Sequence, residues 1–321
     1  MTRLHTPTVF LGLLITLYTS YTTGVWVEVG TKGQVGSSAT AFDPRLQSNN
    51  GCNPSGCTPA LSRDGSLTPT SRWSCSTNLG VNECSITYSF GTTQPFRRID
   101  IAFYRGNERT REFEVDSDST RMIDDESSGN TLSLERFGPT TEVFLTDEVT
   151  IVSTPDDDGE WFSLTEVDIW VIRGEEIADS GRSVSSISAT GFDDRTNSGC
   201  NGQCLPSNSR DGNYQSDSSR WSCQNSDATG GLCSITYGFS SSARLDSILV
   251  SLFRGDKRIR SLRVYLNGNT SPATTWTSSG DTDGFEEIEI NRNGINSVKL
   301  EAYKLENDWL SIKETFFYVS N

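Results

Sequence analysis

The sequence predicts an all-β protein built from two tandem β-sandwiches. The first observation is an internal duplication, in which SRDGSLTPTSRWSC (Ser62 to Cys75) recurs as SRDGNYQSDSSRWSC (Ser209 to Cys223). The second is a series of short alternating or β-branched runs, such as SITYSF, RIDIAFY and EVDIWVI, separated by clusters of Gly, Asn, Asp and Ser. No segment keeps the apolar period of an amphipathic helix for long, which favours strands throughout.

The duplication covers nearly the whole chain. Further matching pairs are SATAFDPR from Ser38 with SATGFDDR from Ser188, CSITYSF from Cys84 with CSITYGF from Cys233, AFYRGNER from Ala102 with SLFRGDKR from Ser251, and EWFSLTEVDIWV from Glu160 with DWLSIKETFFYV from Asp308. The offset stays between 147 and 150 residues. Solenoid repeats are much shorter, so this period indicates a tandem domain duplication.

The first 24 residues have the pattern of a secretory signal peptide. Arg3 precedes an apolar run from Val9 to Tyr18, which is too short to cross a bilayer because a membrane helix needs about 20 residues. We therefore predict cleavage near Gly24 and a secreted protein, extracellular or in a cell wall. The predicted domains are residues 25–174 and 182–321, and the polar segment 175–181 between them is expected to be a linker.

Eight cysteines divide equally between the repeats. In a secreted chain this usage predicts disulfides. Four cysteines allow three pairings in each repeat, and the simplest is local: Cys52 with Cys57, Cys75 with Cys84, Cys200 with Cys204, and Cys223 with Cys233. A zinc site is disfavoured, because the only histidine, His5, lies in the signal peptide.

Positive charge is concentrated in one segment of each repeat, although the net charge of the chain is -15. This acidity argues against nucleic acids and anionic membranes as partners. The basic residues are Arg105, Arg109 and Arg111 in the first repeat, and Arg254, Lys257, Arg258 and Arg260 in the second. Arginine forks match carboxylate and sulfate groups, so they are candidate ligands for an acidic polysaccharide such as an alginate-like uronan. The alternative is a solvated hairpin, turning at Gly106 and Gly255, whose arginines pair with nearby acids.

The Asp-Gly loops and the Arg-Trp pairs are the other shared motifs. Asp64 and Asp211 each precede a glycine in an oxygen-rich loop, which suits a hard cation such as calcium. Alternatively, each aspartate only caps its own turn. Trp73 and Trp221 follow an arginine at the start of a strand, so we interpret them as core anchors in preference to sugar-stacking residues.

The ordered set of an Asp-Gly loop, Ser/Thr, Arg-Trp, Arg-Gly-x-x-Arg and a final strand with Trp and Glu resembles the discoidin, or coagulation factor 5/8 type C, domain. Within that group it is similar to family 32 carbohydrate-binding modules, including those attached to alginate lyases. The resemblance covers nearly all of both repeats. It implies two galactose-binding-like jelly rolls, each with a structural calcium ion. The implied calcium ligands are Asp64, Ser71 and Glu166 in the first repeat, and Asp211, Ser219 and Glu314 in the second.

The chain departs from this family in two respects. Both repeats carry a cysteine-containing insert, NNGCNPSGC from Asn49 and NSGCNGQC from Asn197, where family members often place ligand-contacting loops. The sugar specificity is therefore not carried over. The apolar spikes with which blood-clotting relatives enter membranes are not evident, so phospholipid binding is disfavoured.

The resulting functional prediction is a secreted, non-catalytic carbohydrate-binding protein with two modules. One alternative is an acidic-polysaccharide lyase, although the chain after Gly24 contains no histidine and no carboxylate pair stands out. Another is a matrix or adhesion protein that crosslinks polymers through its two modules. Asn269-Thr270-Ser271 is an N-glycosylation sequon, so Asn269 is a predicted glycan site.

Overall fold

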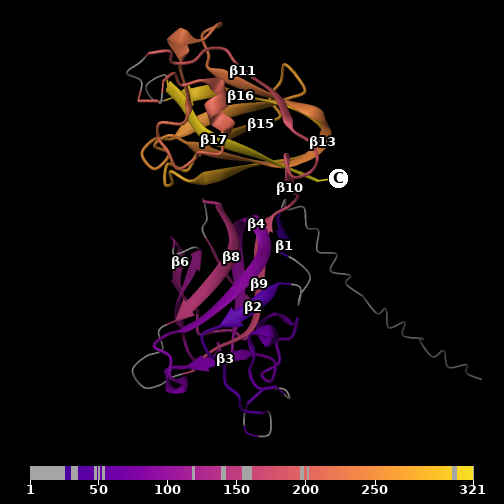
Figure 1. Ribbon diagram of the computed structural model, residues 1–321, viewed down its shortest axis with the longest axis vertical. Coiled ribbons are helices and arrows are strands. Elements are labelled where there is room, and N and C mark those ends of the chain that lie inside the picture. Colours follow the sequence, from indigo (N-terminus) through magenta and orange to yellow (C-terminus); the bar gives the residue numbers. More distant parts are fainter. Residues whose placement is uncertain are drawn as a thin grey trace, which may run out of the picture.

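The computed structural model contains two β-sandwiches that follow one another along the longest axis of the molecule (Figure 1). It describes residues 26–29, 35–46, 49, 51–52, 55–117, 120–138, 142–153, 161–195, 199–200, 202–305 and 309–320. The predicted signal peptide, residues 1–24, lies outside the described residues. Within the described residues, no helix is long and apolar enough to cross a membrane.

The first repeat forms a sheet system with the strand order β1-β9-β4-β8-β5-β6, in which β2 and β7 also pair with β4, and β3 pairs with β9. Its elements are β1 (Trp26–Glu28), β2 (Gly36–Ala39), η2 (Pro59–Arg63), β3 (Trp73–Ser76), η3 (Thr77–Leu79), β4 (Cys84–Phe103), β5 (Glu112–Ser117), β6 (Thr120–Glu126), β7 (Glu135–Phe137), β8 (Phe144–Ser153) and β9 (Trp161–Ile172).

The long strand β4 belongs to both layers of the first sandwich. Its first part, Cys84 to Ser89, pairs with β8, and its last part, from Phe96, pairs with β9. The register shifts between Ser89 and Gln94, where the strand passes from one layer to the other. Alternate residues of each layer therefore face one shared core, which contains the fully buried Trp73.

The second repeat copies this topology, with β13 in the place of β4 and the strand order β10-β17-β13-β16-β14-β15. Its elements are β10 (Glu175–Glu176), β11 (Val184–Ala189), η4 (Pro206–Arg210), β12 (Trp221–Gln224), η5 (Asn225–Asp227), β13 (Ser234–Leu252), β14 (Arg260–Leu266), β15 (Thr274–Thr277), β16 (Phe285–Leu305) and β17 (Trp309–Ser320). In addition, β11 pairs with β13 and β12 pairs with β17.

The segment 175–181, expected to be a linker, is part of the second sandwich. Glu175 and Glu176 form β10 on the edge of β17, and Ile177 is fully buried in the second core. The Glu176 carboxylate also binds the Arg210 guanidinium at 2.6 Å. This strand corresponds to β1 of the first repeat, where Glu28 binds Arg63 at 3.2 Å. The second sandwich therefore starts directly after the first one ends.

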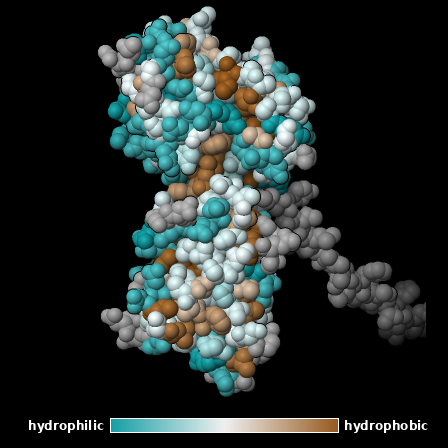
Figure 2. Space-filling model, viewed as in Figure 1, coloured by the Kyte–Doolittle hydropathy of each residue, from teal (hydrophilic) through white to brown (hydrophobic). Residues whose placement is uncertain are grey.

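The two sandwiches share a small apolar interface. Val143 and Ile172 of the first repeat pack with Leu249, Phe285 and Tyr318 of the second, and all five side chains are buried. The backbone N–H of Val143 donates to the carbonyl of Phe285 at 2.8 Å. The space-filling view shows apolar atoms at the waist between the two lobes (Figure 2). Apolar burial of this kind holds the two lobes together.

Several sequence predictions are confirmed by this fold. All four local disulfides form: Cys52–Cys57, Cys75–Cys84, Cys200–Cys204 and Cys223–Cys233. Trp73 and Trp221 are fully buried, and their indole N–H groups donate to the carbonyls of Ala41 and Gly191. The hairpin predicted around Gly106 is wrong: β4 pairs with β9 and β7 there, whereas β5 pairs with β6 and β8. Both flanking runs are strands, but they do not pair with each other.

Candidate functional site

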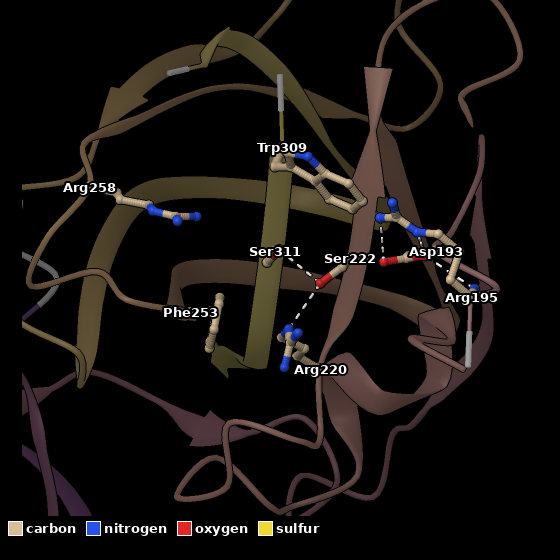
Figure 3. Close-up of a pocket in the computed structure, with 8 residues that line it drawn as sticks. All are labelled: Asp193, Arg195, Arg220, Ser222, Phe253, Arg258, Trp309 and Ser311. Atoms are coloured by element: carbon tan, nitrogen blue, oxygen red, sulfur yellow. Dashed lines mark hydrogen bonds and ion pairs between the residues drawn. The ribbon is translucent and has the colours of Figure 1, made fainter. Parts of the chain in front are cut away.

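A pocket of about 380 Å³ opens at one end of the second sandwich (Figure 3). Its lining consists of three arginines, two aromatic residues, two serines and one aspartate: Arg195, Arg220, Arg258, Phe253, Trp309, Ser222, Ser311 and Asp193. These residues come from the loop after β11, the start of β12, the turn after β13 and the start of β17. We call this set the arginine pocket of the second repeat.

Neighbouring strands set the floor of the pocket. In the antiparallel pair of β12 and β17, Ser222 lies directly opposite Ser311, and the Ser222 hydroxyl donates to the Ser311 hydroxyl at 2.8 Å. The Ser222 hydroxyl also accepts a hydrogen bond of 3.0 Å from Nε of Arg220. Trp309 lies two residues before Ser311, so its ring projects from the same side of the strand. Figure 3 shows these side chains converging from the two strands.

Two guanidinium groups lie against aromatic rings. The Arg195 guanidinium carbon is 4.9 Å from the centre of the Trp309 ring, and that of Arg220 is 4.1 Å from the centre of the Phe253 ring. Cation–π contacts of this type hold each arginine in one orientation. Burial lowers the pKa of Arg220, because removing water disfavours its charge.

Asp193 holds Arg195 in place. The carboxylate accepts hydrogen bonds from Nε at 2.7 Å, from the other guanidinium nitrogen at 3.0 Å and from the Arg195 backbone N–H at 3.2 Å. The side-chain hydrogen bond from Arg195 is the main reason why the pKa of Asp193 is lowered from its ordinary value. The aspartate is 4% exposed, whereas Arg195 keeps most of its side chain in solvent. Arg195 is therefore oriented but still accessible.

The first repeat carries the same constellation. The counterparts of Asp193, Arg195, Arg220, Ser222, Phe253, Arg258, Trp309 and Ser311 are Asp43, Arg45, Arg72, Ser74, Tyr104, Arg109, Trp161 and Ser163. The contacts repeat as well: Arg45 lies 4.6 Å from the centre of the Trp161 ring, and Arg72 lies 4.2 Å from that of Tyr104. Nε of Arg72 donates to the Ser74 hydroxyl at 2.9 Å. One residue type differs between the two sets, Tyr104 against Phe253.

The charge of these pockets opposes that of the chain. Each set contains three guanidinium groups and one carboxylate, which leaves two positive charges in a chain whose net charge is -15. Arg258 lines its pocket without a hydrogen-bond or ion-pair partner among the described residues. Its fork is therefore available to an anionic ligand.

The Arg-Gly motif shapes the turn that supplies the aromatic and the third arginine. Arg105 and Arg254 both adopt left-handed backbone angles, with φ of 55° and 54°. A side chain at Gly106 would meet the carbonyl of Thr131 at 2.5 Å, so glycine is required there by close packing. Because non-glycine residues rarely adopt this φ, its presence in both repeats indicates a backbone that the surrounding fold holds in place.

The structure divides the predicted ligand residues into three groups. Arg258 lines the pocket, and Arg109 is its counterpart, 6.0 Å from the centre of the Tyr104 ring. Arg105 and Arg254 lie beside the same aromatics, at 5.5 and 5.1 Å from the ring centres of Tyr104 and Phe253. The other three predicted residues do not line the pocket. Arg260 is buried, Lys257 pairs with Asp256 at 3.4 Å, and Arg111 donates to the carbonyl of Thr110.

Sequence reasoning missed the residues that form most of the pocket, namely Arg45, Arg72 and Trp161 with their counterparts Arg195, Arg220 and Trp309. A signal was present, because each lies in a segment that both repeats retain. Polar and aromatic residues that both repeats retain, at positions that the pattern of core residues does not explain, are candidates for a shared site.

The short disulfides frame both pockets. Cys57 and Cys204 donate their backbone N–H groups to the carbonyls of Asp43 and Asp193, at 2.8 and 3.1 Å. The inserts that distinguish this chain from the family it resembles therefore lie beside the arginine pockets. They restrain the loop that carries the Asp–Arg pair.

The predicted calcium ligands converge in each repeat. In the second, the Ser219 hydroxyl donates to Asp211, and Glu314 accepts the backbone N–H of Gly212 at 2.8 Å. In the first, the contacts are Ser71 with Asp64, and Gly65 with Glu166 at 2.8 Å. Each glutamate lies on the last strand of its sandwich, so it joins that strand to the Asp-Gly loop.

The second of these sites offers oxygen atoms of the kind that a hard cation takes as ligands. Glu314 is fully buried, and its Oε1 has no hydrogen-bond partner. Burial raises the pKa of Glu314 to about 7. Among the described residues no group of three or more Asp, Glu, His or Cys side chains could hold a metal. Two carboxylates and a hydroxyl would thus need backbone carbonyls to complete a calcium shell.

Comparisons with known proteins find similarity to solved structures only. No protein-family model matches the chain, and no curated protein matches it. The family 32 carbohydrate-binding module of AlyQ, solved with 4,5-unsaturated mannuronic acid, is 26% identical, with coverage of 44% of this chain and 97% of that one and a TM-score of 0.33.

Two further structures span both repeats. A fucolectin from the serum of striped bass, Morone saxatilis, is 15% identical, with coverage of 92% of this chain and 99% of that one and a TM-score of 0.41. A tandem pair of family 32 modules from Clostridium perfringens ZmpB, solved with GalNAc, is 12% identical, with coverage of 91% and 92% and a TM-score of 0.34.

Proposed function

We propose that this chain is a non-catalytic binding protein for acidic polysaccharides, with one anionic sugar unit bound in the arginine pocket of each repeat. The observation that carries the proposal is that both repeats retain the side chains of this constellation, with Tyr104 in the place of Phe253, and that each set has an excess of two positive charges in an acidic chain. A neutral sugar would not use the unpaired Arg258 fork, whereas a uronate carboxylate matches it.

The polar floor and the aromatic wall suit the rest of a sugar unit. The Ser222 and Ser311 hydroxyls lie beside the guanidinium of Arg220, and all three line the pocket. Trp309 is half-buried and offers ring surface to the C–H groups of a sugar. The two pockets together would raise avidity for a polymer, because one chain could engage both. We expect an alginate-like uronan in a cell wall or an extracellular matrix to be the ligand.

Two further proposals accompany this function. The four disulfides support a secreted protein, because such bonds persist in oxidising compartments. We also propose one structural calcium ion in each repeat, held by the Asp-Gly loop and the glutamate of the last strand. Calcium would neutralise the buried carboxylate of Glu314.

Binding of mannuronate oligomers, measured by titration calorimetry, tests the proposed function. The chain should bind the acidic oligomer, and a neutral oligosaccharide of equal length should bind at least about tenfold more weakly. Arg258→Gln should weaken binding at the second pocket, and combining it with Arg109→Gln should abolish most of the affinity. Both substitutions should leave the melting temperature unchanged within about 2 °C, because these forks lie at the pocket.

Arg292→Gln is the matched control, since Arg292 is an exposed arginine of the second repeat that does not line the pocket. This variant should bind as the wild type does. Equal affinity of the double pocket variant and the wild type for the acidic oligomer would refute the proposal. Release of unsaturated uronate, seen as a rise in ultraviolet absorbance, would instead identify a lyase.

A further inference from the structure

We infer that the first repeat has a second, apolar subsite beside its arginine pocket, which takes an acetyl or methyl substituent carried by the acidic polymer. This inference rests on the proposed function. It assigns to the first repeat a recognition feature that the second repeat lacks.

The subsite is a cavity of about 270 Å³ in the first repeat. Its apolar walls come from the Asp-Gly loop, the end of β4 and the segment before β7, and they consist of Leu67, Pro69, Phe103, Tyr104 and Leu132. Leu67 and Leu132 are 48% and 52% exposed, an unusual state for two leucines that line one cavity. Arg105, Asn107 and Glu108 supply the polar part of the lining, with Thr165 as the remaining contact.

Tyr104 connects the subsite to the arginine pocket. Its ring lines the cavity, and the same ring lies against the guanidinium of Arg72 at 4.2 Å. Arg105 also lines the cavity and lies 5.5 Å from the centre of the Tyr104 ring. A sugar unit held by the arginine pocket therefore has the cavity as its neighbour, because the Tyr104 ring borders both. A substituent on that unit or on the next one can reach it.

The second repeat places charge where the first has this cavity. Leu132 and Thr165 correspond to Asp283 and Lys313, which form an ion pair of 3.0 Å. The Lys313 side chain is buried. Pro69 corresponds to an aspartate, Asp217. The duplicated fold therefore tolerates either an ion pair or an apolar cavity at this place, and the two repeats differ in which they carry.

The chemistry of the walls selects the kind of group that binds. A bare sugar ring brings hydroxyl groups, which would lose their hydrogen bonds to water against aliphatic walls. The methyl group of an acetyl ester buries apolar surface there, and its carbonyl can accept hydrogen bonds from Asn107 or Arg105 at the rim. The volume is below the usual range for a whole ligand, so the cavity suits a substituent.

The test compares mannuronate oligomers with the same preparation after chemical O-acetylation, by titration calorimetry. The Arg258→Gln chain is used throughout, so that binding at the first repeat dominates. The acetylated oligomer should bind about tenfold more tightly than the unmodified one, which is the lower end of the discrimination that an apolar pocket provides for one small group. Leu132→Asp, which installs the residue of the second repeat, should remove this preference, because any repulsion by its added charge weakens the binding of both oligomers alike.

Leu232→Asp is the matched control, because Leu232 is an exposed leucine that lines neither site. It should keep the preference for the acetylated oligomer. If the Arg258→Gln chain, which keeps Leu132, bound both oligomers with equal affinity, the proposed subsite would be wrong and the proposed function would remain intact. Loss of the preference in the Leu232→Asp chain would also overturn it. Failure of both oligomers to bind would refute the proposed function, and the subsite with it.

Discussion

The arginines of the pocket have different functions at the level of single residues. Arg220 is buried, lies against Phe253 and bonds the Ser222 hydroxyl, so its main effect is to build the floor. Arg195 is bound on one side by Asp193 and open on the other. Arg258 has no partner among the described residues and is free for a ligand. A lysine would not replace any of them, because the flat fork both stacks and makes paired hydrogen bonds.

Asp193→Asn should lower stability at neutral pH by about 1–2 kcal/mol, because a buried carboxylate loses its charge-assisted bonds to a partly exposed arginine. The folded-state pKa of Asp193 is below its ordinary value, so this stabilisation is present above the unfolded pKa. It is lost as the pH falls through the folded pKa. Denaturant unfolding curves should therefore differ between wild type and variant at neutral pH and converge in acid, once the pH has fallen below the folded-state pKa of Asp193.

The neighbouring exposed Asp194 provides the control for this experiment. Asp194→Asn should change stability by less than about 0.5 kcal/mol at either pH. A difference between Asp193→Asn and the wild type that persists at the acidic pH would show that the charge of the pair is not its cause.

The sequence alone located the features that depend on residues close together in the chain. The disulfides join cysteines only a few residues apart, and the Trp73 and Trp221 anchors follow a repeated tetrapeptide, so both leave a short-range pattern. The pocket does not, because Arg195 follows β11, Arg220 precedes β12 and Trp309 opens β17, so the three meet only in the folded sandwich. Searching for local charge density therefore included Arg258, which lines the pocket, but also Arg260, which is buried.

Strand pairing also explains the errors at the level of secondary structure elements. Strands β4 and β5 are adjacent in sequence and look like a hairpin, yet β4 pairs with β8 and β9 along its length. Residues 175–181 have the composition of a linker, but Glu176 binds Arg210 and Ile177 fills the core. Polar composition does not distinguish an edge strand from a linker, because an edge strand also presents polar residues to solvent.

Calcium should act on two elements together, the Asp-Gly loop and the last strand. A ligand that binds only the folded chain adds about 2.7 kcal/mol at a hundredfold excess over its Kd. EDTA should therefore lower the melting temperature of the wild type by several degrees, and added calcium should restore it better than magnesium. The Asp211→Ala variant should have a lower melting temperature than the wild type, and its second repeat should no longer respond to EDTA. Asp64→Ala should have the same two effects in the first repeat.

Asp281→Ala is the control for this series, because Asp281 is an exposed acid outside the loop. It should respond to EDTA as the wild type does. A wild-type melting curve that EDTA leaves unchanged would mean that the Asp-Gly loop is only a capped turn.

At the scale of the whole molecule, two positions where the sandwiches meet differ in polarity between the repeats. Leu249 and Phe316 of the second repeat face the first, whereas the equivalent positions of the first repeat are Asp100 and Asp168. Asp100 there accepts a hydrogen bond from Trp170 at 2.9 Å. The same surface is thus polar in one repeat and apolar in the other. This difference indicates that the apolar residues of the second repeat are specific to the interface.

Leu249→Asp combined with Phe316→Asp should separate the two sandwiches, because a buried, unpaired carboxylate at the interface costs several kcal/mol. Each sandwich should keep its fold, since the first repeat carries aspartate at both equivalent positions. Small-angle scattering should show a larger radius of gyration for the double variant, and avidity for long acidic polymers should fall although affinity for short oligomers does not. Leu232→Asp, which adds a charge at an exposed leucine away from the interface, should change neither quantity. An unchanged radius of gyration in a folded double variant would show that contacts other than this apolar cluster, such as the bond between Val143 and Phe285, are enough to hold the two repeats together.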